Sequence, residues 1–294
     1  MDIVRSWLIA PANRPALLRK WHSCVADCYV IDLEDGTPEA EKAATRAALP
    51  GIVADLKRGG LSGLLHVRVN EPLSPHTPRD LEAALATDID GISIPKLGNV
   101  EELKPFLRAV EAAEKARPGK RFGIIGGIES AQGLLNVAAI CAADPHLIGI
   151  YFGAEDFATD VGGMRRTRQG LEVLYARSRI VLGAHAARIA ALDQAVLDFR
   201  NDDLFREDCE HGRDLGFDGK ICIHPRQAEL ANVHFSPSPK EIDFSRRLIQ
   251  AYDEAERQGI GTIAFEGLMV DGPLVKRAKA VVAVAERMAA RDTL

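Results

Sequence analysis

The stretch Gly123-Ile-Ile-Gly-Gly-Ile-Glu129-Ser-Ala-Gln decides the fold class of this chain. A short apolar run over residues 124–128 ends at the carboxylate of Glu129, and a segment with helical character begins near Ala131. A short, continuously apolar run is typical of a parallel strand that is buried on both faces. The stretch therefore predicts a β/α unit whose strand carries an acid at its carboxyl end.

The same pattern recurs one unit later, where Leu147-Ile-Gly-Ile-Tyr-Phe-Gly153 runs into Glu155 and Asp156. If the two strands are parallel neighbours, Glu129 and Asp156 emerge on the same rim, where carboxylate oxygens can bind a divalent cation such as Mg²⁺. The alternative is that each acid only caps the helix behind it. These two segments alone leave both interpretations open.

Eight strand-like runs of this type alternate with helical segments along the chain. The seventh is the weakest, because its Ala and Leu residues fit a helix as well. This alternation predicts an α/β fold, a (β/α)8 TIM barrel over residues 1–235, followed by a C-terminal helical extension over residues 236–294. The eight runs cover residues 6–10, 28–33, 64–69, 91–96, 124–128, 147–153, 190–197 and 218–223.

Local signals support this order of elements. Asn13 is a plausible cap for the first helix, Thr37 and Pro38 can start the next one, and Asn99 and Glu102 stand at the spacing of a capping box. The loop after the first strand lacks the glycine fingerprint that a doubly wound dinucleotide-binding sheet would need. These signals favour the barrel.

The composition excludes several classes of protein. An apolar fraction of 47%, a charged fraction of 27% and a net charge of −5 describe an ordinary globular chain with no basic stripe for nucleic acid. No apolar run is long enough to span a membrane and the first residues lack the layout of a signal peptide, so we expect a cytoplasmic protein. The five scattered cysteines suit reduced thiols better than a disulfide framework.

Catalytic groups of TIM barrels lie at the carboxyl ends of the strands. The polar residues of this chain gather at those predicted ends, which places its chemistry on one face of the barrel. In chain order they are Asn13, Arg14, Glu34, Asp35, Arg68, Asn70, Lys96, Glu129, Glu155, Asp156 and His224.

These residues also carry a resemblance that covers almost the whole chain. The chain resembles the citrate lyase β-subunit-like proteins of the HpcH/HpaI aldolase superfamily, a group that includes malyl-CoA and citramalyl-CoA lyases. Ala12 departs from the pattern, since the family often has Gly there. The matching motifs are Arg5-Ser-Trp-Leu-Ile-Ala-Pro-Ala-Asn-Arg14, Asp32-Leu-Glu-Asp-Gly, Val67-Arg-Val-Asn70, Ile94-Pro-Lys96, Ile128-Glu-Ser-Ala-Gln-Gly133, Phe152-Gly-Ala-Glu-Asp156, Gly219-Lys-Ile-Cys-Ile-His-Pro225 and Met269-Val-Asp-Gly-Pro273.

The resemblance implies a metal site. Glu129 and Asp156 would be direct ligands of Mg²⁺, with Mn²⁺ as an alternative ion, and Glu34 and Asp35 would hold metal-bound waters. Arg68 would bind carbonyl or carboxylate oxygens of the substrate.

The resemblance also implies an acid/base residue, further substrate-binding residues and an oligomeric state. Asp271, which a neighbouring subunit often lends in this family, would act as the acid/base. Arg14, Lys20 and Lys96 would bind the acyl-CoA phosphates or a substrate carboxylate. A homotrimer or homohexamer is expected.

The implied activity is that of a Mg²⁺-dependent carbon–carbon lyase, which cleaves or forms a 3-hydroxyacyl-CoA thioester of the malyl-, citramalyl- or citryl-CoA type. Its small-molecule partners would be an acyl-CoA and a 2-oxo acid, with CoA entering as part of the substrate. Three alternatives stay open: a thioester hydrolase on the same site, a CoA-independent 2-keto-acid aldolase, and a non-catalytic acyl-CoA-binding subunit.

Structural roles compete with these functional ones. Arg68 could pair with Glu34 or Asp35, and Lys96 could simply neutralise the acidic rim. His224 before Pro225 is typical of a rim histidine that orients a neighbour. Further structural alternatives are Asp271 as the start of the last helix, Glu155 as a solvent-facing acid, and Arg165-Arg166-Thr-Arg168 as a solvated loop.

Overall fold

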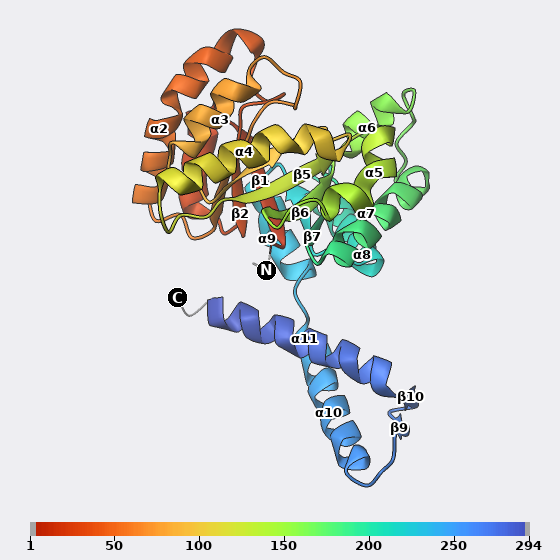
Figure 1. Cartoon of the computed structure of the whole chain (residues 1–294). Coiled ribbons are helices and arrows are strands. Elements are labelled where there is room, and N and C mark those ends of the chain that lie inside the picture. The colour runs from red at the N-terminus through yellow and green to blue at the C-terminus, as the bar shows by residue number, and fades with distance from the viewer. Residues whose placement is uncertain (1–3, 292–294) are drawn as a thin grey trace. The chain divides into compact units, whose positions relative to one another are not determined.

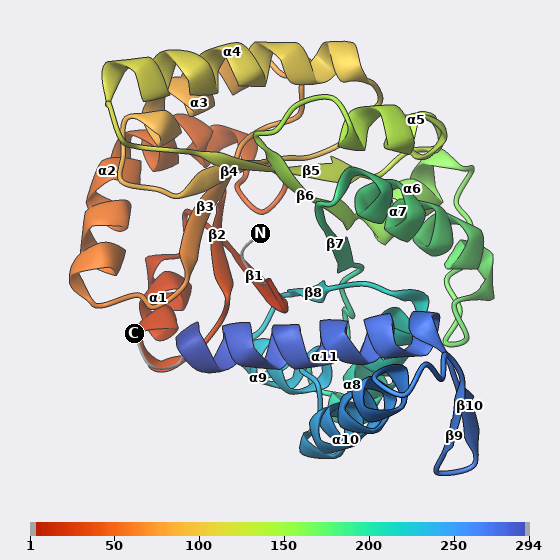
Figure 2. The same cartoon turned by 60° about the horizontal axis from the view of Figure 1, so that its bottom comes forward.

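A computed structural model describes residues 4–291, and its first part is a closed barrel of eight parallel strands. The strands are hydrogen-bonded in chain order and β8 returns to β1, as Figure 2 shows. This confirms the predicted α/β TIM-barrel class. The strands are β1 (Ser6–Pro11), β2 (Cys28–Asp32), β3 (Leu64–Arg68), β4 (Gly91–Ile94), β5 (Gly123–Ile128), β6 (Leu147–Phe152), β7 (Ala190–Asp193) and β8 (Gly219–Cys222).

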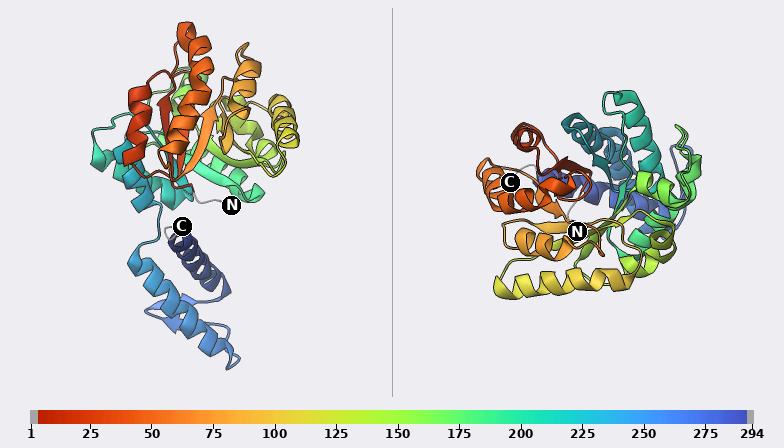
Figure 3. Two further views of the ribbon diagram at one scale, coloured as in Figure 1. Left: turned by 90° about the vertical axis from the view of Figure 1, so that its left-hand side faces the viewer. Right: turned by 90° about the horizontal axis from the view of Figure 1, so that it is seen from above.

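Helices connect successive strands and lie outside the ring, as Figures 1 and 3 show. They are α1 (Pro15–Leu18), η1 (Arg19–Ser23), η2 (Glu39–Glu41), α2 (Lys42–Arg58), α3 (Thr77–Leu85), α4 (Val100–Ala116), α5 (Ala131–Cys141), α6 (Ala154–Asp160), η3 (Leu171–Val173), α7 (Leu174–Ala187), α8 (Asp202–Leu215) and α9 (Pro225–His234). No helix within residues 4–291 is long and apolar enough to cross a membrane.

The core has two parts because successive residues of a strand point to opposite faces. Trp7, Val30 and Tyr151 belong to a cluster inside the barrel. Their chain neighbours, such as Leu8 and Ile31, pack in a larger cluster that also contains helix residues and fills the layer between strands and helices. The inner cluster forms the floor below the candidate site.

Two details of the barrel differ from the sequence-based predictions. Asn13 does not cap α1: its side chain instead donates to Glu41 Oε2 at 2.7 Å, and Arg14 occupies the cap position without a side-chain hydrogen bond. Strand β7 ends at Asp193 rather than near residue 197. The Asn99 cap is confirmed, since its Oδ1 accepts from Glu102 N at 3.1 Å, whereas Glu102 Oε2 accepts from Gly98 N rather than from Asn99 N.

All five cysteines are buried and free, as expected for reduced thiols. Burial raises the pKa of the Cys141 thiol to about 12, so this thiol stays protonated at neutral pH. The cysteines therefore act as small apolar core residues.

The chain divides into two compact units, Met1–Phe235 and Ser236–Leu294. The second unit contains α10 (Pro239–Glu256), a β-hairpin and α11 (Gly272–Arg291), packed around Leu248, Tyr252 and Val270. The hairpin strands β9 (Ile263–Phe265) and β10 (Leu268–Val270) were not predicted. Glu266 and Gly267 both have positive φ, 47° and 82°, which is the two-residue turn that matches the twist of a hairpin.

Candidate active site

The polar residues predicted at the strand ends do gather at the carboxyl rim of the barrel. Glu34 and Asp35 follow β2, Arg68 ends β3, Lys96 follows β4 and Glu129 follows β5. Asp156 lies in the first turn of α6, directly after β6. The two acids predicted to share a rim therefore do so.

Glu129 is buried, and one of its two carboxylate oxygens is held by hydrogen bonds. Its Oε1 accepts from the Tyr151 hydroxyl at 2.6 Å and from the Lys96 backbone N–H at 3.3 Å. Burial raises the pKa of Glu129 to about 7, although Arg68 and Tyr151 act to lower it. The remaining contributions, from Glu34 and Asp156, raise the pKa further, so the negative charges of these three groups interact.

Two glycines make room for the Glu129 side chain. A Cβ at Gly127 would lie 2.5 Å from Glu129 Oε1 and from the Tyr151 hydroxyl oxygen, and a Cβ at Gly153 would lie 2.6 Å from Glu129 Cγ. Both distances are too short for real atoms. Gly127 and Gly153 are therefore required by the close approach of the acid.

Arg68 is fixed by Asp32, which belongs to the motif Asp32-Leu-Glu-Asp-Gly but was not among the predicted site residues. Its Nε and Nη2 donate to the two oxygens of Asp32, each at 2.8 Å, and its Nη1 lies 3.1 Å from Glu34 Oε2. Burial acts to raise the pKa of Asp32, but the charge and hydrogen bonds of Arg68, together with the backbone N–H groups of Glu34 and Gly36, lower that pKa overall. An acid inside an otherwise apolar strand was the available signal, because a buried carboxylate needs a partner.

Lys96 bridges the acids around the rim. Its ammonium lies 2.7 Å from Glu34 Oε1, 3.0 Å from Asp35 Oδ2 and 3.8 Å from Asp156 Oδ1. Burial opposes its charge, but Glu34 and Asp35 outweigh burial and raise its pKa. Lys96 also has a φ of 54°, an uncommon backbone conformation for a residue with a side chain.

The donor set fits a hard divalent cation. Both carboxylate oxygens of Glu34 are buried without a hydrogen bond of good geometry, although cationic nitrogens lie nearby. Within residues 4–291 no set of three His, Cys, Asp or Glu side chains is arranged as a complete metal cage. Mg²⁺ commonly takes only one or two carboxylates and keeps several waters, so two carboxylates such as those of Glu129 and Asp156 would suffice.

Three predicted residues of the first unit, Arg14, Lys20 and His224, lie outside the network of contacts described above, and the predicted Asp271 belongs to the other unit. Arg14, at the N-cap of α1, and Lys20, on η1, are exposed. His224 caps α9, accepts from Arg226 N at 3.2 Å and stacks on Phe199, which agrees with an orienting role. Asp271 belongs to the C-terminal unit, where it directly precedes α11.

The loop expected to be a solvated arginine cluster is partly anchored. Arg166 donates to Gln194 at 2.6 Å and lies 3.4 Å from both Glu155 and Glu172. Glu155 is therefore paired with a cation, with half of its side chain exposed. Arg168 pairs with Glu207 on α8.

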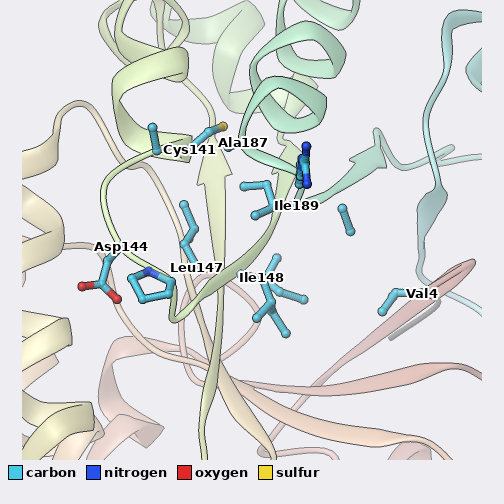
Figure 4. Close-up of a pocket in the computed structure, with 12 residues that line it drawn as sticks. Val4, Cys141, Asp144, Leu147, Ile148, Ala187 and Ile189 are labelled. Atoms are coloured by element: carbon cyan, nitrogen blue, oxygen red, sulfur yellow. The ribbon is translucent and has the colours of Figure 1, made fainter. Parts of the chain in front are cut away.

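A cavity of about 600 Å³ lies at the other end of the barrel, at the amino ends of β6 and β7 (Figure 4). Leu147, Ile148 and Ala190 form part of its wall. Because catalytic groups lie at the carboxyl rim, this cavity is separate from the candidate active site.

The chain is similar to known proteins of one family. The family model described as HpcH/HpaI aldolase/citrate lyase matches residues 5–225. The citrate lyase subunit beta-like protein of Deinococcus radiodurans is 39% identical over 280 residues, which cover 94% of this chain and 95% of that protein. A (3S)-malyl-CoA thioesterase of Cereibacter sphaeroides is 36% identical over 97% of this chain and 96% of its own length.

Among solved structures, CitE from Mycobacterium tuberculosis in complex with magnesium, acetoacetate and coenzyme A has a TM-score of 0.78 and 32% identity. The match covers 96% of this chain and 97% of that one. With the barrel and its acidic rim, these similarities show that the chain belongs to the HpcH/HpaI aldolase/citrate lyase family.

Proposed function

We propose that this protein is a Mg²⁺-dependent carbon–carbon lyase, which cleaves or forms a 3-hydroxyacyl-CoA thioester of the malyl-, citramalyl- or citryl-CoA type. The observation that carries the proposal is the convergence of Glu129, Asp156 and Glu34 beside Arg68 at the carboxyl rim. The complex of the similar CitE protein with magnesium, acetoacetate and coenzyme A supports it.

The acids have the chemistry that such a reaction needs. Glu129 and Asp156 would hold Mg²⁺, with Mn²⁺ as an alternative, and Glu34 and Asp35 would orient waters on it. A bound Mg²⁺ supplies positive charge that lowers the pKa of the substrate hydroxyl and fixes its orientation. The positive charge of Lys96 would balance the negative charge of the carboxylates that do not contact the metal.

Arg68 would bind the oxo-acid oxygens. Asp32 occupies the Nε and Nη2 edge of its guanidinium, which leaves further N–H groups on Nη1 and Nη2 for the substrate. The charge of Arg68 is permanent and its plane is fixed by Asp32, so it is suited to stabilise an oxyanion that develops during the reaction.

Asp271 would be the acid/base on carbon. In the direction of synthesis its carboxylate takes a proton from the acyl-CoA methyl group, and the resulting carbon attacks the carbonyl carbon of the oxo acid. The carbonyl oxygen then takes up a proton from solvent and becomes the hydroxyl, and Asp271 releases to solvent the proton that it took from carbon. Arg14, Lys20 and Lys96 remain proposed binders of the CoA phosphates or of a substrate carboxylate.

A thioester hydrolase is the second candidate, because a (3S)-malyl-CoA thioesterase is about as similar to this chain as the citrate lyase relatives are. On the same site, water would attack the thioester carbonyl and free CoA would leave.

One experiment separates the candidates. The purified protein is incubated with Mg²⁺, acetyl-CoA and either glyoxylate or oxaloacetate, and the products are identified by mass spectrometry. A lyase forms the adduct, whereas a hydrolase releases free CoA from added malyl-CoA without forming glyoxylate. Turnover of free 2-keto acids without CoA would indicate an aldolase, and metal binding without any turnover would indicate a binding subunit.

A further inference from the structure

Tyr151 is a buried residue of the site to which the proposed reaction gives no role. It lies on β6 with its side chain inside the barrel, where it is 2% exposed and its ring centroid is 5.0 Å from that of Trp7. Its hydroxyl donates to Glu129 Oε1 at 2.6 Å. A tyrosine hydroxyl has one proton to donate, and here that proton is committed to the carboxylate.

The hydrogen bonds of Glu129 are unevenly distributed over its two oxygens. Oε1 accepts from both Tyr151 and the Lys96 backbone N–H, whereas no residue within 4–291 donates a hydrogen bond to Oε2. Gly153, in the turn that leads to Asp156, faces this second oxygen: a Cβ there would lie 2.8 Å from Oε2. The uncommitted oxygen therefore faces the turn that leads to the other proposed ligand.

The position of Tyr151 leaves it little freedom. Gly127 lacks the Cβ that would lie 2.5 Å from the Tyr151 hydroxyl oxygen, so the ring can extend across β5 to reach the acid. Trp7 packs against the Tyr151 ring inside the barrel. A carboxylate held by a rigid donor loses little conformational freedom when it binds a cation.

We infer that Tyr151 is a positioning residue, which holds Oε1 of Glu129 so that Oε2 is presented to the divalent cation. The inference rests on the proposed function, in which Glu129 is a metal ligand. Hydrogen-bond partners of ligating carboxylates typically affect metal affinity by about 10- to 100-fold when they are removed.

The test is metal affinity of Tyr151→Phe, measured by calorimetry with Mg²⁺ and by electron paramagnetic resonance with Mn²⁺. We expect binding weaker by about tenfold or more, and half-maximal activity at a correspondingly higher Mg²⁺ concentration with kcat at saturating metal reduced less. The matched control is Tyr29→Phe, because Tyr29 is equally buried and its hydroxyl donates to Cys24 O at 2.6 Å, on the other side of the strand layer. The control should bind metal like the wild type.

The outcomes are distinguishable. If the wild type binds no divalent cation, the proposed function fails. If the wild type binds metal and Tyr151→Phe binds it with unchanged affinity, the proposed function stands and the positioning role is wrong. A variant that merely loses stability, as the control should, lowers the melting temperature without changing the affinity of the folded protein.

A second measurement does not depend on the variant folding. The chain has four tyrosines, so wild-type protein labelled with 3-fluorotyrosine gives few fluorine resonances, and Tyr→Phe variants at Tyr29, Tyr175 and Tyr252 identify that of Tyr151 by elimination. Metal titration should shift the Tyr151 resonance more than the other three. A Tyr151 resonance that stays in place while the metal binds would overturn the inference.

Discussion

At the scale of single residues, Arg68 shows how a permanent charge is kept in place in a buried site. Asp32 holds one edge of its guanidinium through two hydrogen bonds, and Glu34 lies near the other. The sequence left two roles open for Arg68, a structural pairing with an acid and the binding of substrate. The two are compatible, because the structural contact with Asp32 sets the orientation in which the remaining N–H groups can bind a substrate.

Arg68→Lys should separate these effects. Lysine keeps the charge but loses the planar pair of donors, so we expect kcat/KM to fall by about 100-fold or more. The matched control is Arg46→Lys, since Arg46 donates to the buried Asp80 at 2.7 Å in a similar environment between α2 and α3. Steady-state kinetics and thermal melts of both variants should show a loss of stability in both and a loss of activity only in Arg68→Lys. Equal activity of the two variants would show that Arg68 takes no part in the reaction.

The buried His66 makes the free energy of unfolding depend on pH. It is fully buried in β3, and burial lowers its pKa from 6.5 to about 4. The unfolded chain therefore binds a proton at a pH where the folded chain does not, so the stability present above pH 6.5 is lost as the pH falls towards 4. Between pH 7 and pH 5 this loss amounts to about 2 kcal/mol.

Urea unfolding of the wild type and of His66→Gln at both pH values measures this contribution. The variant should be less stable at pH 7 but should lose about 2 kcal/mol less between pH 7 and pH 5. The difference isolates His66, because the carboxylates titrate in both proteins. Parallel pH dependences would show that His66 does not titrate in this way.

At the scale of elements, β5 and β6 build the site together through their pairing. Gly127 pairs with Tyr151 across the two strands, which places the missing side chain of one beside the phenol of the other. Glu129 directly follows β5, and its carboxylate has room because position 127 is a glycine. Gly127 is therefore a requirement of the site and not of strand formation, which glycine disfavours.

Gly127→Ala should therefore damage the site more than a glycine replacement elsewhere. The added Cβ would lie 2.5 Å from Glu129 Oε1 and would displace this carboxylate. We therefore expect Mg²⁺ affinity to fall by at least about tenfold, as when a residue that orients a metal ligand is lost. The control is Gly51→Ala, because Gly51 lies in the interior of α2, where the added Cβ would have no neighbouring side chain or distant backbone within 4 Å. That control should stabilise the protein by about 1 kcal/mol and bind metal normally. Calorimetric titration and urea unfolding give both quantities.

At the scale of the whole molecule, the two compact units carry different parts of the proposed reaction. The metal and oxo-acid residues belong to Met1–Phe235, and Asp271 belongs to Ser236–Leu294. The proposal that a neighbouring subunit lends Asp271, in a homotrimer or homohexamer, has a direct consequence. Two variants that are each inactive should complement each other in a mixed oligomer.

Asp271→Asn and Arg68→Lys are suited to this test. Each variant alone should lose most activity, but after dissociation and reassembly of a 1:1 mixture, about a quarter of the sites would combine an intact Arg68 with an intact Asp271. Activity of the mixture is compared with that of the separate variants, and light scattering gives the oligomeric state. A mixture no more active than its components, in an oligomer shown to exchange subunits, would place Asp271 in the same chain as the site that it serves.

The sequence by itself determined the barrel and the rim on which its chemistry lies. Apolar runs of strand length that alternate with helices are local signals. An acid that closely follows such a run emerges at the carboxyl end of the strand, so Glu129 and Asp156 could be selected from the sequence. The tertiary structure alone decided which side chains meet across strands. Two pairs depend on strand register and on the space that glycines leave: Asp32 with Arg68, and Tyr151 with Glu129. The hairpin of β9 and β10 depends on a turn whose residues are only weak sequence signals. Strand pairing and close packing are long-range properties, and no local pattern in the sequence encodes them.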